Sequence, residues 1–60
     1  MKIGTQFRID TDRVSQYEGT RIVDTVSVLV VPKKYAKKVL VHSPYLMASV
    51  LVWLKDLKNI

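Results

Sequence analysis

The absence of cysteine limits how this chain can be stabilised. The chain has 60 residues and no cysteine, and His42 is its only histidine. Domains this small bury only about 60% of the surface that the unfolded chain exposes, so they often depend on a disulfide, a structural metal ion or a partner subunit. A disulfide is impossible here, and a zinc site would have one histidine and no thiolate. We therefore expect a single domain over residues 1–60 that relies on close core packing or on self-association as a homodimer.

The N-terminal half of the chain has the residue pattern of a β-sheet. Ile3, Phe7 and Ile9 alternate with polar residues, which is the period of a half-buried strand. Residues 20–31 are rich in β-branched side chains, which favour strands, and the last four of them are apolar on both faces. A strand that is apolar on both faces is covered on both, so this second strand is expected in the middle of the sheet. Residues 13–17 fit either a third, short strand or a loop.

Two helices are expected after the sheet. Pro32 suits a first helical turn, and on a helical wheel residues 32–40 divide into a lysine arc and an apolar arc. Ser43 and Pro44 resemble an N-cap and a first helical residue, and the apolar residues that follow, through Leu57, fill about half of a helical wheel. The predicted fold class is therefore α+β, a small antiparallel sheet of two to three strands followed by a short basic helix and a longer C-terminal amphipathic helix packed on the sheet.

The positive charge of the chain is concentrated in its C-terminal part. The formal net charge is +5, yet residues 1–24 contain as many acidic as basic residues. The excess comes from six lysines after residue 24, which are opposed by Asp56 alone. Four of these lysines form what we call the lysine cluster: Lys33, Lys34, Lys37 and Lys38. Like charges one helical turn apart repel, and an anionic partner would relieve that repulsion. The lysine cluster is therefore a predicted contact for nucleic acid or an acidic partner, with an ordinary solvated face as the alternative.

The C-terminal helix offers a second predicted contact surface. Its apolar face is wider than the stripe that one face of a sheet would cover, so part of it is free to meet a partner. The residues predicted for a protein interface are Trp53, Val52, Tyr45 and Ser49. Trp53 is the expected anchor, because tryptophan is enriched among the residues that dominate binding energy. The alternative is that Trp53 belongs to the core of its own domain.

No catalytic or cofactor-binding motif is present. Asp10 and Asp12 supply too few ligands for a metal ion, and a turn explains them better. His42 has no cysteine and no positioned acid to act with. Two glycines are too few for a phosphate-binding loop. We therefore predict no enzyme activity, no catalytic residue, no metal ion, no cofactor and no small-molecule substrate.

These features predict a small interaction or regulatory protein that binds a larger protein, as adaptors, antitoxins and virus- or phage-encoded inhibitors do. The alternative is a basic accessory protein that binds nucleic acid through the lysine cluster, and a weaker alternative is attachment to a membrane surface. No apolar stretch reaches the roughly 20 residues that a membrane-spanning helix needs, and the first residues lack the apolar core of a signal peptide. The expected location is the cytoplasm.

Overall fold

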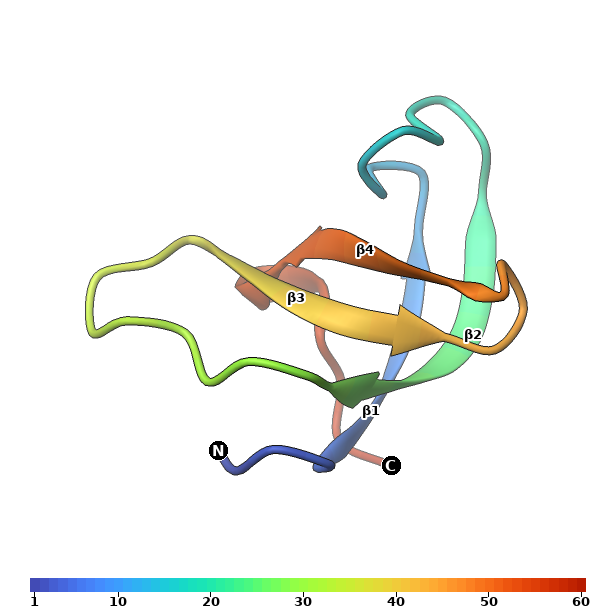
Figure 1. Cartoon of the computed structure of the whole chain (residues 1–60). Helices are drawn as coiled ribbons and strands as arrows, with labels where there is room; N and C mark the ends of the chain where they lie inside the picture. The colour runs from blue at the N-terminus through green and yellow to red at the C-terminus, as the bar shows by residue number, and fades with distance from the viewer.

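The computed structural model describes all 60 residues and contains one antiparallel sheet of four strands in the order β1-β2-β3-β4 (Figure 1). The strands are β1 (Gln6–Thr11), β2 (Ile22–Val28), β3 (Lys38–Ser43) and β4 (Ala48–Trp53). One 3₁₀ turn, η1 (Leu54–Asp56), follows β4. There is no α-helix, and hence none that could cross a membrane.

The sheet curves around its own core, and both of its edges are bridged (Figure 1). Beyond η1, Lys58 pairs with Arg8 of β1, and the backbone N–H of each donates to the carbonyl of the other at 2.8 and 2.9 Å. At the other edge, the N–H of Ser15 donates to the carbonyl of Leu51 in β4 at 3.1 Å. The N–H of Leu51 donates in return to Ser15 Oγ at 3.0 Å. Each edge strand therefore has a partner, which limits the open edge that favours association through strands.

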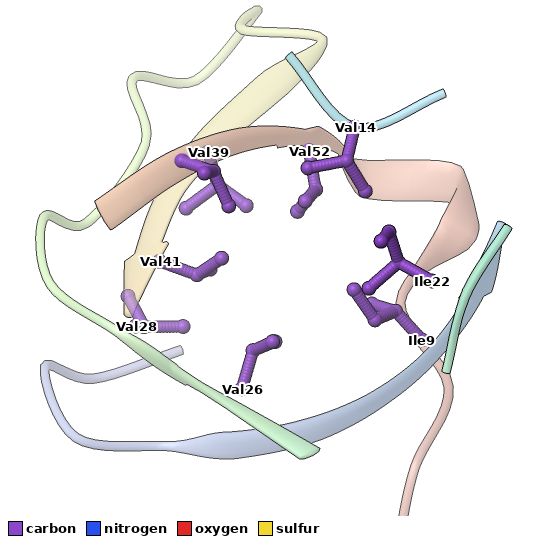
Figure 2. Close-up of a cluster of buried hydrophobic side chains, with 9 residues drawn as sticks. Ile9, Val14, Ile22, Val26, Val28, Val39, Val41 and Val52 are labelled. Carbon is purple, nitrogen blue, oxygen red and sulfur yellow. The ribbon is translucent and has the colours of Figure 1, made fainter. Parts of the chain in front are cut away.

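A single set of inward-facing aliphatic side chains forms the core, and Figure 2 shows them pointing toward one another from the surrounding strands and, for Val14, from the loop between β1 and β2. The nine buried members are Ile9, Val14, Ile22, Val26, Val28, Val39, Val41, Val50 and Val52. Those from β2, β3 and β4 occupy alternate positions, because successive side chains of a strand point to opposite faces. The odd-numbered residues of β3 and the even-numbered residues of β4 therefore fill the core, and the intervening residues form the outer face.

The predicted strands are present, with different limits. The N-terminal strand is β1, and β2 lies inside the sheet between β1 and β3, where the second strand was expected. However, β2 ends at Val28, and residues 29–31 begin the loop that leads to β3. Residues 13–17 form a turn and not a strand.

The predicted α+β class and its short basic helix are wrong. Residues 29–37 form a loop, and β3 begins at Lys38. Within β3, Val39 and Val41 are buried while Lys38 and His42 are exposed, which is a strand pattern. The lysines separate from the apolar residues on a helical wheel, but this did not indicate a helix. Most of the lysine cluster lies in a loop, in which side chains have no regular period.

The predicted C-terminal helix is wrong as well. Residues 44–47 form a tight turn, in which the N–H of Met47 donates to the carbonyl of Pro44 at 3.2 Å, and β4 follows. The sequence from Val50 to Leu54 is apolar without interruption, and the periodicity of such a run does not distinguish a helix from a strand. Here it is a strand whose inner side chains enter the core and whose outer side chains, Leu51 and Trp53, are partly exposed.

Met47 provides a test of the β3–β4 turn. Its φ is 53°, a left-handed conformation that costs a residue with a large side chain about 1–2 kcal/mol, and its side chain is 86% exposed. We expect Met47→Asn to raise the free energy of unfolding by about 0.5–1 kcal/mol, because asparagine tolerates this conformation. Urea denaturation measures the change. Tyr45→Asn is the control, since Tyr45 is exposed in the same turn but has a negative φ. An equal gain in both variants would contradict the backbone explanation.

Candidate functional site

The lysine cluster lies at one end of the β3–β4 hairpin. Lys33, Lys34 and Lys37 are in the β2–β3 loop, and Lys38 is the first residue of β3. All four side chains are exposed. No lysine in the chain forms an ion pair, because both ion pairs in the structure are made by arginines. The charge of the lysine cluster is therefore not neutralised by the domain itself.

Trp53 lies directly opposite Lys38 in the register of β3 and β4. The Nζ of Lys38 is 5.0 Å from the centroid of the indole ring. Lys55, in η1, places its Nζ 5.2 Å from the same centroid. Both distances are those of cation–π interactions, which contribute about 0.5–1 kcal/mol each at exposed sites. The fold thus brings together the lysine cluster and Trp53, which the sequence suggested as two separate sites.

The end of β4 fixes this arrangement. The N–H of Leu54 donates to the carbonyl of Lys37 at 2.9 Å, which ties the β2–β3 loop to η1. Lys37, Trp53, Leu54 and Lys55 line a hollow of about 370 Å³. Trp53, which lines this hollow, is half-buried. We refer to Lys37, Lys38, Trp53 and Lys55 as the Lys–Trp surface.

An apolar hollow of about 380 Å³ adjoins the Lys–Trp surface. Its lining includes apolar residues of the outer sheet face and of the β2–β3 loop: Val30, Val31, Leu40 and Leu51. Leu40 and Leu51 are paired across β3 and β4, two residues along each strand from the Lys38–Trp53 pair. Lys38 lines this hollow as well. The outer face of the hairpin is therefore basic and aromatic at one end and apolar in its middle.

The four residues predicted for a protein interface do not lie together. Val52 belongs to the core and is fully buried. Tyr45 is exposed in the β3–β4 turn, and Ser49 pairs with His42 near that turn. Of the four, only Trp53 joins the lysines. Tyr45, Ser49 and Trp53 follow one another at intervals of four residues, which would place them close together on one face of a helix. Four residues rise about 6 Å in a helix but about 13 Å in a strand, so the strand separates them.

The sequence analysis did not include Lys55 in either site. The structure places Lys55 in η1, beside the indole of Trp53. The available signal was its position two residues after Trp53, in a segment that follows a strand. That signal is usable only once the segment is known not to be helical.

Two of the five acidic residues, Asp10 and Asp56, are paired with arginines. Arg21 donates to both carboxylate oxygens of Asp10 at 2.8 and 2.9 Å, and this hydrogen bonding holds the pKa of Asp10 below its usual value. The same contact raises the pKa of Arg21. Asp56 accepts hydrogen bonds from Arg13 at 2.6 Å and from Thr11 Oγ1 at 3.0 Å. These acids therefore pair with arginines and a threonine and do not offset the lysine cluster.

The residue types of the Lys–Trp surface define what it can bind. Lysine ammonium groups contact phosphate or carboxylate as point charges, and an indole ring offers a flat apolar face with a polarised edge. No three histidine, aspartate or glutamate side chains are grouped so that they could hold a metal ion. A fold of this kind does not itself specify a function, so the argument has to rest on this surface. Comparisons of the chain with protein-family models, with curated proteins and with solved structures found no match.

Proposed function

We propose that this protein is a non-catalytic binding domain that contacts nucleic acid through the Lys–Trp surface and the rest of the lysine cluster. The observation that carries the proposal is the convergence of Lys38 and Lys55 on Trp53, next to further lysines that have no acidic partner. A basic surface combined with an aromatic side chain is the usual composition of a site that binds nucleic acid strands. Nucleic acid binding through the lysine cluster was the alternative function predicted from the sequence, and we place it before a protein partner.

Lysine contacts are expected to fall on the phosphate backbone. The lysine ammonium group lacks the planar pair of donors with which arginine recognises guanine, so it contributes affinity and not base readout. All the basic residues at this surface are lysines, since the three arginines occur at positions 8, 13 and 21. Binding without sequence specificity is therefore the expected mode.

A larger protein is the second candidate partner, and the apolar hollow is the observation that favours it. Val30, Val31 and Leu51 are each about half exposed there, which is unusual for clustered aliphatic side chains. The wide apolar face of a C-terminal helix, one of the reasons for predicting a protein partner, is absent because the structure contains no such helix. Attachment to a membrane surface relied on the same helices. A homodimer and a cytoplasmic location stay predictions from the sequence.

A salt titration tests the proposed function. Each phosphate contact contributes about −0.7 to the slope of log K against log[salt] for single strands. If three to five lysines make contact, affinity should fall roughly 20- to 130-fold between 50 and 200 mM salt. Fluorescence anisotropy of labelled DNA and RNA oligonucleotides gives the affinity at each salt concentration.

Lys2→Glu is the matched control, because Lys2 is exposed but lies outside the lysine cluster. This variant should keep the slope of the wild type. Absence of binding at 50 mM salt by the folded protein, or affinity independent of salt, would contradict the proposed function. Leu51→Glu, within the apolar hollow, would then be the variant with which to test a protein partner.

A further inference from the structure

We infer that Trp53 stacks on an unpaired base, so that the nucleic acid bound at the Lys–Trp surface is single-stranded. This inference rests on the proposed function and specifies the class of nucleic acid and the group that the indole contacts. It follows from how Trp53 is held and from which groups surround it.

The backbone of Trp53 is held by the hairpin. It is the last residue of β4, its backbone lies opposite that of Lys38, and η1 follows it immediately. The hydrogen bond from Leu54 N–H to the Lys37 carbonyl, at 2.9 Å, anchors the backbone on its C-terminal side. Trp53 is half-buried and borders the hollow of about 370 Å³. A half-exposed aromatic ring on an anchored backbone can accept a base at a lower cost in conformational freedom than one on a loose segment.

The two lysines at the ring match the chemistry of a nucleotide within a strand. Each base of a strand lies between two backbone phosphates, and two ammonium groups, of Lys38 and Lys55, lie about 5 Å from the indole centroid. A base on the ring would displace these weak cation–π contacts, and both ammonium groups would be within reach of the flanking phosphates. In a duplex, the faces of the bases are covered by their neighbours, so the indole would have no partner there.

A second exposed aromatic side chain, that of Tyr35 in the β2–β3 loop, also has a lysine at its ring. Tyr35 lies inside the lysine cluster and is 85% exposed, and the Nζ of Lys34 is 5.5 Å from its ring centroid. An exposed tyrosine with a lysine at its ring does not contribute to the core. Its exposure provides a second face on which a base can stack. The lysine cluster and Lys55 thus accompany two aromatic rings, and this alternation of basic and aromatic groups favours a strand with accessible bases.

The intrinsic fluorescence of Trp53 tests the inference directly, because Trp53 is the only tryptophan. The protein is titrated with three ligands of equal length at one salt concentration: oligothymidylate, an abasic strand with the same backbone, and a duplex. We expect oligothymidylate to quench Trp53 and to bind about tenfold or more tightly than the abasic strand, because only the former has bases to stack. The abasic strand and the duplex should bind through phosphates and leave the fluorescence of Trp53 nearly unchanged.

Substitution of Trp53 provides the second measurement. Trp53→Leu should weaken oligothymidylate binding by about 5- to 100-fold while keeping the salt slope, and Trp53→Phe should recover part of the loss. Tyr45→Leu is the control, since Tyr45 is an exposed aromatic residue at the far end of the hairpin. Its affinity should equal that of the wild type. If Trp53→Leu does not fold, as judged by circular dichroism, the comparison of wild-type binding to the oligothymidylate and abasic strands decides the question.

The outcomes separate this inference from the proposed function. Equal affinity for all three ligands without quenching of Trp53 would overturn base stacking and leave phosphate binding intact. Tighter binding to the duplex would overturn it as well. Absence of binding to every ligand would overturn both the inference and the proposed function.

Discussion

Ile22→Ala is expected to lower the free energy of unfolding by about 2–5 kcal/mol, which is the usual cost of truncating a buried isoleucine. Ile22 is 1% exposed and is one of the nine core residues. A domain of this size has a total stability of only about 3–9 kcal/mol, and it has no disulfide to compensate. The substitution should therefore remove a large part of the stability of the domain. Urea denaturation followed by far-ultraviolet circular dichroism measures the change.

The neighbouring residue supplies the control. Val23 is 55% exposed on the opposite face of β2, and Val23→Ala should change the free energy of unfolding by no more than about 0.5 kcal/mol. The contrast tests the register in which Ile22 lies opposite Thr11, because a shift of one residue would exchange the two faces of the strand. Similar losses in both variants would contradict this register.

The first half of the fold was predictable because its signals are local. Alternation around Phe7 and Ile9 indicated β1, and the density of β-branched residues between Ile22 and Val28 indicated β2. Neither signal depends on knowing what the strand pairs with. The end of β2 was predicted too late because Val30 and Val31 look like strand residues, although the fold places them at the border of an exposed hollow.

The second half was not predictable in the same way, and Ser43 shows why. Its Oγ accepts a hydrogen bond from the N–H of Leu46 at 3.2 Å, which is the bond expected from an N-cap. However, Met47 then adopts a left-handed conformation, so the chain reverses and does not continue as a helix. Ser43 also donates to Asp24 of β2, and Asp24 accepts the N–H of Tyr45 at 3.1 Å. This contact between distant segments fixes the turn, and nothing in the local sequence reports it.

The candidate site, too, was only partly predictable from the sequence. The lysine cluster is visible in the sequence, and Trp53 stands out as the only tryptophan. Their proximity depends on the β3–β4 register, which places Lys38 opposite Trp53. In a helix, residues 45, 49, 52 and 53 would have been oriented by the helical period, and Val52 was therefore assigned to the surface. In β4 successive side chains point to opposite faces, and Val52 is in the core. Individual residues could thus be predicted, whereas their arrangement required the hairpin.

Reversing the charge of the whole lysine cluster is expected to abolish nucleic acid binding. The variant replaces Lys33, Lys34, Lys37 and Lys38 by glutamate, and it lowers the formal net charge from +5 to −3 because each substitution removes two units. Losing four phosphate contacts at 50 mM salt should weaken binding to single strands roughly 10³-fold or more, by loss of counterion release. The residual affinity should lie outside the measurable range in an anisotropy titration. All four side chains are exposed, so thermal unfolding should be close to that of the wild type.

A pair of double variants separates the position of the charge from its total. Lys37→Glu with Lys38→Glu, and Lys2→Glu with Lys58→Glu, each lower the net charge from +5 to +1. The first pair lies at Trp53, and the second pair lies outside the lysine cluster. If binding occurs at the Lys–Trp surface, the first variant should lose most of its affinity for nucleic acid. The second variant should lose only the affinity that comes from long-range electrostatic attraction, which is screened beyond about 10 Å at 0.1 M salt. Equal losses would mean that total charge controls binding, and they would contradict a defined site at Trp53.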